Sequence, residues 1–144
     1  MLMNTKNKSG FTLIEVLIVV SIIGLLSSVV LIGLGGFRTK GADTRRIADL
    51  HQAQTALELY YSKNSLYPPS STWAVLEDTL VGAAIGVKNL SNDPTSGATY
   101  LYGSSGQGYT LGAKLKGADP ALDNDVDGGS DSINCNDPTY CVSF

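Results

Sequence analysis

A single carboxylate lies within the longest apolar stretch of this sequence. From Phe11 to Phe37 the only ionisable side chain is Glu15, and the remaining residues are almost all aliphatic, small or hydroxylated. A charge in an apolar environment is costly and by default implies a partner that compensates it. The sequence therefore predicts a functional role for Glu15, and that role depends on what the stretch around it does.

A second group of carboxylates crowds the C-terminal part of the chain. The run DNDVDGGSD, residues 123–131, contains the pattern D-x-D-x-D-G, which resembles the opening of a calcium-binding loop. An EF-hand would need a glutamate at the position of Asn134 and two flanking helices, so we exclude that motif. The candidate Ca²⁺ ligands are Asp123, Asp125, Asp127 and Asp131. The alternative is a solvated acidic turn whose Asp and Gly residues serve only turn geometry.

The two cysteines, Cys135 and Cys141, lie close together in CNDPTYC. A structural zinc site normally takes four ligands, and no histidine or third cysteine is near. The spacing favours a disulfide that closes a short loop, which requires an oxidising compartment and hence export.

No pattern in the sequence indicates an enzyme. His51 is the only histidine, and no nucleophile elbow, phosphate-binding loop or paired metal-ligand set accompanies it. We expect His51 to be a surface or subunit-contact residue. The net charge of −3 gives no electrostatic reason to expect a nucleic-acid site.

The apolar run is long enough to cross a bilayer as one helix. A cleavable secretory signal has a shorter apolar segment followed by a small-residue cleavage site, and neither is present. The simplest alternative is a signal anchor, with Lys6 and Lys8 kept in the cytoplasm. That alternative leaves Glu15 unexplained.

The stretch KSGFTLIEVLIVVSIIGLL, residues 8–26, resembles the class III signal of type IV pilins and type II secretion pseudopilins. The resemblance implies that a prepilin peptidase removes residues 1–10 by cutting between Gly10 and Phe11 and then methylates Phe11. It also implies that Glu15 pairs with the N-terminal amine of Phe11 in a neighbouring subunit. The implied partners are further copies in a helical filament, the peptidase, the membrane and an inner-membrane assembly platform.

A long helix must position these N-terminal residues. Residues 11–37 are apolar on every side, and residues 38–63 repeat apolar positions every three or four residues, which predicts one helix of about 50 residues. Gly33, Gly35, Gly36 and Gly41 weaken this helix, and we hypothesise that they form a flexible joint. Pro68 and Pro69 end the helical pattern, and Asn64 is a suitable last residue.

The rest of the chain predicts an antiparallel sheet. Residues 64–99 form a connecting region with one short helix near Trp73 to Leu80, in which Trp73 is a core residue. Residues 100–144 begin with a hairpin, because tyrosines alternate on both sides of the turn GSSGQG. A last strand near Tyr140 to Ser143 completes the sheet. The expected fold is α+β, the type IV pilin fold, with the helix packed on a small sheet.

Three functions follow from these observations. The first is the subunit of a type IV pilus filament, held in the inner membrane as a single-pass protein and later exposed on a cell-surface or periplasmic filament. The second is a major pseudopilin of a type II secretion system. The tyrosine-rich hairpin and the acidic loop resemble the corresponding regions of major pseudopilins, and this resemblance also implies that the acidic loop binds calcium. The third is a membrane-anchored binding domain that never polymerises, which Glu15 and the cleavage motif disfavour.

Overall fold

The computed structural model describes residues 10–69 and 72–144. The predicted leader, residues 1–10, lies outside the described residues except for Gly10. The chain divides into two compact units, one ending at Phe37 and the other running from Arg38 to Phe144. We describe each unit by itself.

The predicted long helix is confirmed. Helix α1 spans Leu13–Asn64 and has 52 residues. It ends where Ser65 adopts a positive φ of 57°, and the side chain of Asn64 donates a hydrogen bond to the carbonyl oxygen of Tyr60. Gly35, Gly36 and Gly41 are all helical, and outside the backbone of their own turns no described atom lies within 4 Å of where a Cβ on them would be. The flexible joint at these glycines stays a prediction.

The first unit contains the apolar part of α1. Leu13–Val30 is long and apolar enough to cross a membrane, and none of these residues is buried against the rest of the protein. Two of its serines donate to their own helix: Ser21 Oγ lies 2.8 Å from the carbonyl oxygen of Leu17, and Ser28 Oγ lies 2.7 Å from that of Leu25. Because these hydroxyls are satisfied within the helix, they can enter an apolar environment at low cost.

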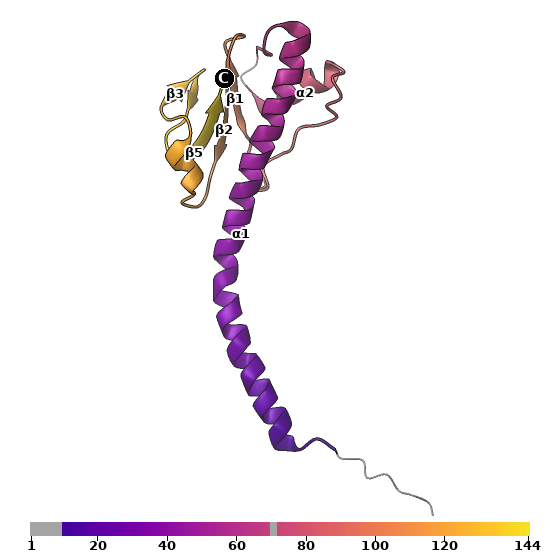
Figure 1. Ribbon diagram of the computed structural model, residues 1–144, viewed down its shortest axis with the longest axis vertical. Helices are drawn as coiled ribbons and strands as arrows, with labels where there is room; N and C mark the ends of the chain where they lie inside the picture. Colours follow the sequence, from indigo (N-terminus) through magenta and orange to yellow (C-terminus); the bar gives the residue numbers. More distant parts are fainter. Residues whose placement is uncertain (1–9, 70–71) are drawn as a thin grey trace, which may run out of the picture. The chain divides into compact units, whose positions relative to one another are not determined.

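The second unit is built on a three-stranded antiparallel sheet. Strands β1 (Leu101–Ser104), β2 (Tyr109–Lys114) and β5 (Thr139–Ser143) lie in the order β1-β2-β5, so β2 is central (Figure 1). In the register, Tyr102 is opposite Leu111 and Leu111 is opposite Val142. Both the predicted hairpin and the predicted last strand are present.

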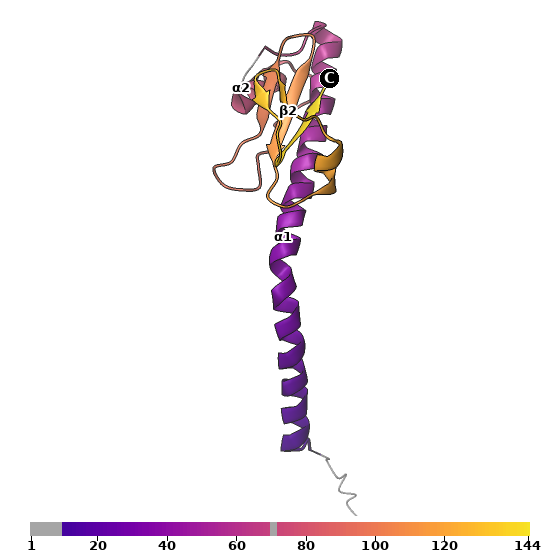
Figure 2. The ribbon, with the colours of Figure 1, turned by 90° about the vertical axis from the view of Figure 1, so that its left-hand side faces the viewer.

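The core of this unit lies between the sheet and the second half of α1. The helix buries Leu50, Ala53 and Leu57, and β2 contributes Leu111 and Ala113. Figure 2 shows the sheet in front of this part of α1, with α2 on the β1 side. The packing explains why only this half of α1 has an amphipathic pattern.

Helix α2 (Trp73–Gly82) begins at Thr72, whose side chain accepts a hydrogen bond from the amide of Val75. Its first residue is the predicted core tryptophan. Trp73 is 4% exposed, its ring meets that of Tyr100 edge to face, and its indole N–H donates to the carbonyl oxygen of Ser91. The assignment of Trp73 to the core is confirmed.

Three short elements between β2 and β5 were not predicted. They are the 3₁₀ helix η1 (Pro120–Asn124) and the two-stranded pair β3 (Gly129–Ser130) and β4 (Ile133–Asn134). The turn that joins β3 to β4 approaches β1 so closely that a Cβ on Gly103 would overlap the carbonyl oxygen of Asp131. Glycine at position 103 therefore allows this turn to pack on the main sheet.

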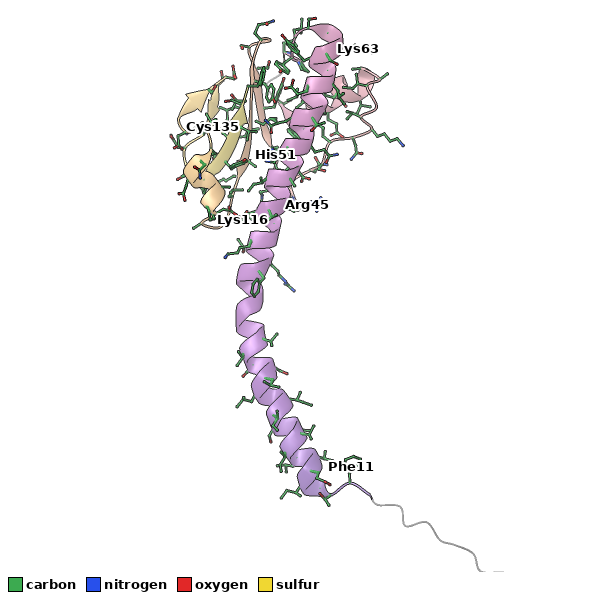
Figure 3. The ribbon with its side chains drawn as sticks, viewed as in Figure 1. Phe11, Arg45, His51, Lys63, Lys116 and Cys135 are labelled. Carbon is green, nitrogen blue, oxygen red and sulfur yellow. A yellow bond between two sulfur atoms is a disulfide. The ribbon has the colours of Figure 1, made fainter. Side chains whose placement is uncertain are left out.

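A buried ionic network joins α1 to two distant loops. Arg46 is 1% exposed and forms a bidentate pair with Asp93, with nitrogen to oxygen distances of 2.7 and 2.9 Å. It also lies 2.6 Å from Asp43. The carboxylate of Asp43 accepts the backbone amides of Lys116 and Gly117 at 3.0 and 2.9 Å, which places this turn beside α1 (Figure 3). The hydrogen bond to Asp93 is the main cause that raises the pKa of Arg46.

Candidate processing, assembly and cation sites

The start of α1 forms a capping box around Glu15. One oxygen of its carboxylate accepts both the backbone amide and the hydroxyl of Thr12, each at 2.8 Å, and the hydroxyl oxygen of Thr12 accepts the amide of Glu15 at 3.3 Å. This reciprocal arrangement satisfies two of the amides that a helix N-terminus leaves without partners. In a single chain, Glu15 therefore has a local hydrogen-bonding partner but no cationic one among the described residues.

The two residues of the expected cleavage step precede α1. Gly10 and Phe11 lie outside the helix, and the side chain of Phe11 is 89% exposed. Figure 3 shows Phe11 at the beginning of the helical part of the chain. The backbone of both residues is therefore held in neither a helix nor a strand.

The acidic run brings together a set of carboxylates that differs from the predicted one. Ligand oxygens of Asp125, Asp127 and Asp137 lie within 4.8 Å of one another. Asp125 and Asp127 were predicted, and Asp137 was not. Burial raises the pKa of Asp125, the amide of Cys141 opposes this rise, and the negative charges of Asp127 and Asp137 add to it. Three convergent carboxylates of this kind suit a hard divalent cation.

One oxygen of this cluster lacks a partner. The Oδ1 atom of Asp125 is buried and accepts no hydrogen bond within the described residues, whereas its Oδ2 accepts the amide of Cys141 at 2.7 Å. A buried carboxylate oxygen without a partner is destabilising. A cation at this position would satisfy it, so the residues present fit the expected metal ion.

The structure places the other two predicted ligands elsewhere. Asp123 belongs to η1 and is not part of the cluster. The carboxylate of Asp131 accepts the hydroxyl of Thr110 at 2.9 Å and so fixes the β3–β4 turn to β2. The structure thus groups two of the four predicted ligands with Asp137, and calcium binding by the predicted set stays a prediction. The chain bends away after Asp127, and a later loop returns to provide Asp137.

Two further sequence predictions are confirmed. Cys135 and Cys141 form a disulfide with a Cα–Cα distance of 5.7 Å, and both residues are fully buried. His51 is exposed on α1, where its Nδ1 lies 2.8 Å from Oε1 of Gln54 (Figure 3). The local partner of Glu15 was missed, although the spacing of Thr12 and Glu15 in T-x-x-E is a recognisable capping signal.

Together, the fold and these sites define an α+β protein with one exposed apolar helical span at its N-terminal side. Comparison with known proteins gives the family. Residues 5–31 match the prokaryotic N-terminal methylation motif. The chain is 31% identical over 125 residues to the type II secretion system core protein G of Vibrio cholerae, a match that covers 79% of this chain and 83% of that protein.

Other relatives match mainly one part of the chain. The type II secretion system core protein G of Aeromonas hydrophila is 36% identical over 66 residues, which is 46% of each chain. The type IV wide pilus major component of Thermus thermophilus is 40% identical over 62 residues, which is 43% of this chain and 47% of that protein. No solved structure matches significantly. The chain belongs to the family of type IV pilins and type II secretion pseudopilins.

Proposed function

We propose that this chain is a structural subunit that polymerises into a helical filament after cleavage between Gly10 and Phe11. The observation that carries the proposal is the exposed apolar span Leu13–Val30, which contains Glu15 near its start. Such a span needs an apolar environment on every side, which a bilayer provides before assembly and a bundle of identical helices provides afterwards. The matched methylation motif supports processing of Phe11 by a prepilin peptidase.

In the proposed filament, Glu15 exchanges its partner. Cleavage creates a positively charged amine at Phe11, and this amine also lies in an apolar environment. Pairing between the amine of one subunit and Glu15 of the next compensates both charges. A subunit in the wrong axial position loses this pair, so the pair sets the register. The contact is head-to-tail and does not close, which is the symmetry of a helical filament.

The test compares two substitutions in the same apolar helix. We expect Glu15→Ala to abolish or strongly slow filament formation in cells that express the full chain. Ser21→Ala should assemble normally, because among the described residues the hydroxyl of Ser21 bonds to its own helix. Filaments are counted by electron microscopy, and the membrane level of each variant is measured by immunoblot. Assembly of Glu15→Ala at the normal rate and with the same axial rise would refute the pairing.

The filament has two candidate identities, a type IV pilus and a secretion pseudopilus. A relative that is named as a type IV pilus component supports the first. The Vibrio cholerae match, which extends over most of both chains, supports the second. Long surface fibres made of this subunit would identify a pilus. Loss of protein secretion on deletion, without such fibres, would identify a pseudopilus.

The subunit resides in the inner membrane beside its assembly platform in both cases. That the chain is not an enzyme stays a prediction.

We further propose that Asp125, Asp127 and Asp137 hold Ca²⁺, with the remaining ligands from water or backbone carbonyls. The buried oxygen of Asp125 supports this proposal. The ion would neutralise three crowded carboxylates and fix the segment between β2 and β5. We expect the melting temperature of the full chain to be higher in calcium than in chelator. An unchanged melting temperature would refute calcium binding.

A further inference from the structure

The loop that carries Asp137 is closed by the disulfide. Cys135 follows β4 and Cys141 lies in β5, with a sequence separation of 6. Asp137 is inside this closed loop. The loop is also fixed from within, because the amide of Thr139 donates to the carbonyl oxygen of Asn136 at 3.1 Å. The position of the third carboxylate of the cluster therefore depends on a covalently closed turn.

The backbone of both cysteines holds the acidic run itself. The amide of Cys141 donates to Asp125 at 2.7 Å, and its carbonyl oxygen accepts the amide of Val126 at 3.3 Å. The amide of Cys135 donates to the carbonyl oxygen of Gly128 at 2.6 Å. These bonds lie on either side of Asp127. The disulfide thus joins the two points that anchor the segment contributing Asp125 and Asp127.

We propose that the Cys135–Cys141 disulfide presets the cation site, so that the cross-linked chain binds Ca²⁺ more tightly than a chain without the cross-link. The inference rests on the proposed calcium site. Three carboxylates repel one another when the ion is absent, and a free loop would relieve this repulsion by moving Asp137 away. The cross-link prevents that movement. The unfavourable free energy of holding the carboxylates close together therefore accompanies folding and does not weaken calcium binding.

The first test is a calcium titration by isothermal calorimetry on the full chain in detergent micelles, after removal of metal with chelator. Substituting both cysteines, Cys135→Ser with Cys141→Ser, should weaken binding by about tenfold or more, as expected when the residues that orient ligands are lost. Asp137→Asn should also weaken it, whereas the matched control Asp123→Asn should bind within about twofold of the unaltered chain. Fluorescence of Trp73 in chelator reports whether each variant is folded.

A second measurement needs no substitution and remains decisive if the double-serine variant does not fold. Coupling between two events is reciprocal, so calcium must protect the disulfide as much as the disulfide favours calcium. Dithiothreitol reduces the bond by giving two electrons and two protons to the cysteines and becoming a cyclic disulfide. We expect saturating calcium to shift the equilibrium between disulfide and dithiol about tenfold toward the disulfide, as measured by thiol labelling and mass spectrometry in a buffer of reduced and oxidised dithiothreitol.

The outcomes separate the two proposals. An unaltered chain that binds no calcium refutes the cation site and the inference with it. Equal calcium affinity in the folded double-serine variant, or an equal equilibrium between disulfide and dithiol with and without calcium, refutes only the role of the disulfide. Unchanged affinity in Asp137→Asn shows that the closed loop contributes no ligand and likewise overturns the inference.

Discussion

Two charged residues on helix α1, Glu15 and Arg46, are hydrogen-bonded in opposite ways. At its start, Glu15 is exposed and is held by Thr12, three positions earlier. Further along, Arg46 is buried and is held by Asp43 on the same helix and by Asp93, which is 47 positions later in the sequence. We call Glu15 with Thr12 the open group, because it is exposed and local. We call Arg46 with Asp43 and Asp93 the enclosed group, because it is buried and joins distant segments.

The difference shows which partners the chain can release. The bonds between Glu15 and Thr12 can open without disturbing any packed residue, so Glu15 is available to a neighbouring subunit. The pair between Arg46 and Asp93 cannot open without leaving unpaired charges in the protein interior, which is strongly unfavourable. Thr12 can therefore be replaced as the partner of Glu15 during the proposed assembly, whereas Asp93 must stay paired with Arg46 for the second unit to remain folded.

The largest expected effect comes from breaking the enclosed group. Arg46→Met leaves the carboxylates of Asp43 and Asp93 without their cation, and we expect the free energy of unfolding to fall by about 3–5 kcal/mol. The measurement is a urea titration of the full chain in detergent micelles. Trp73 is the only tryptophan and is buried, so its fluorescence reports unfolding of the second unit.

Arg45→Met is the matched control. The side chain of Arg45 is 58% exposed and its nitrogen lies 3.6 Å from Asp49, whose side chain is 10% exposed and also accepts the hydroxyl of Tyr100 at 2.7 Å. Because the guanidinium of Arg45 faces solvent and Asp49 keeps a second partner, we expect the loss of this pair to cost about 1 kcal/mol or less. If the two substitutions lowered stability equally, the distinction between the enclosed and the exposed arginine would be wrong.

A smaller effect is expected from acid. Burial raises the pKa of Asp93, but hydrogen bonds from Arg46 and from the amide of Thr95 outweigh it and hold the pKa below its ordinary value of 3.8. The unfolded chain therefore takes up this proton more readily. The stabilisation is complete above the ordinary pKa and is lost as the pH falls through the lower pKa of the folded state. Urea titrations at a series of acidic pH values measure this loss.

Asp93→Asn removes this titration. We expect the variant to be less stable at neutral pH and to lose less of its remaining stability below about pH 4 than the unaltered chain. Parallel acid profiles of the two proteins would show that Asp93 contributes nothing to the pH dependence.

The smallest effect concerns the open group. Thr12→Val removes the hydroxyl that caps α1, and we expect amides of the first turn to exchange with solvent faster, on the order of fivefold. Global unfolding followed by Trp73 should not change, because among the described residues Thr12 and Glu15 bond only to each other and to their own helix. Hydrogen exchange of the full chain in micelles measures the first effect. A lower urea midpoint in this variant would mean that the cap also stabilises the second unit.

The sequence allowed prediction of the elements whose signals are local. The periodicity from Ile47 to Tyr61 and the apolar run before it predicted α1, and the alternating tyrosines predicted β1 and β2. These patterns suffice because each reflects the repeat of a single helix or strand. The disulfide was also predictable, because its two cysteines are close in the sequence.

The features that sequence reasoning missed depend on contacts between distant segments. Asp137 joins Asp125 only because β5 and the closed loop return beside the acidic run. Arg46 belongs to a basic group in the sequence, and nothing in that group distinguishes the buried arginine from the exposed Arg45. Likewise, Asp131 fits the calcium pattern by spacing, but its contact with Thr110 depends on how the β3–β4 turn packs against the sheet.

The position of the Arg46 network along α1 has a mechanical consequence. Among the described residues, Asp43 is the first buried side chain along α1, and Arg46 follows one turn later. In a filament under tension, a pull transmitted along α1 would reach this network near the start of the second unit. The bidentate pair with Asp93 and the amides bound by Asp43 would then share the load between the loop before β1 and the turn after β2. Detachment of α1 would require these bonds to break together, so the subunit would resist being peeled apart one contact at a time.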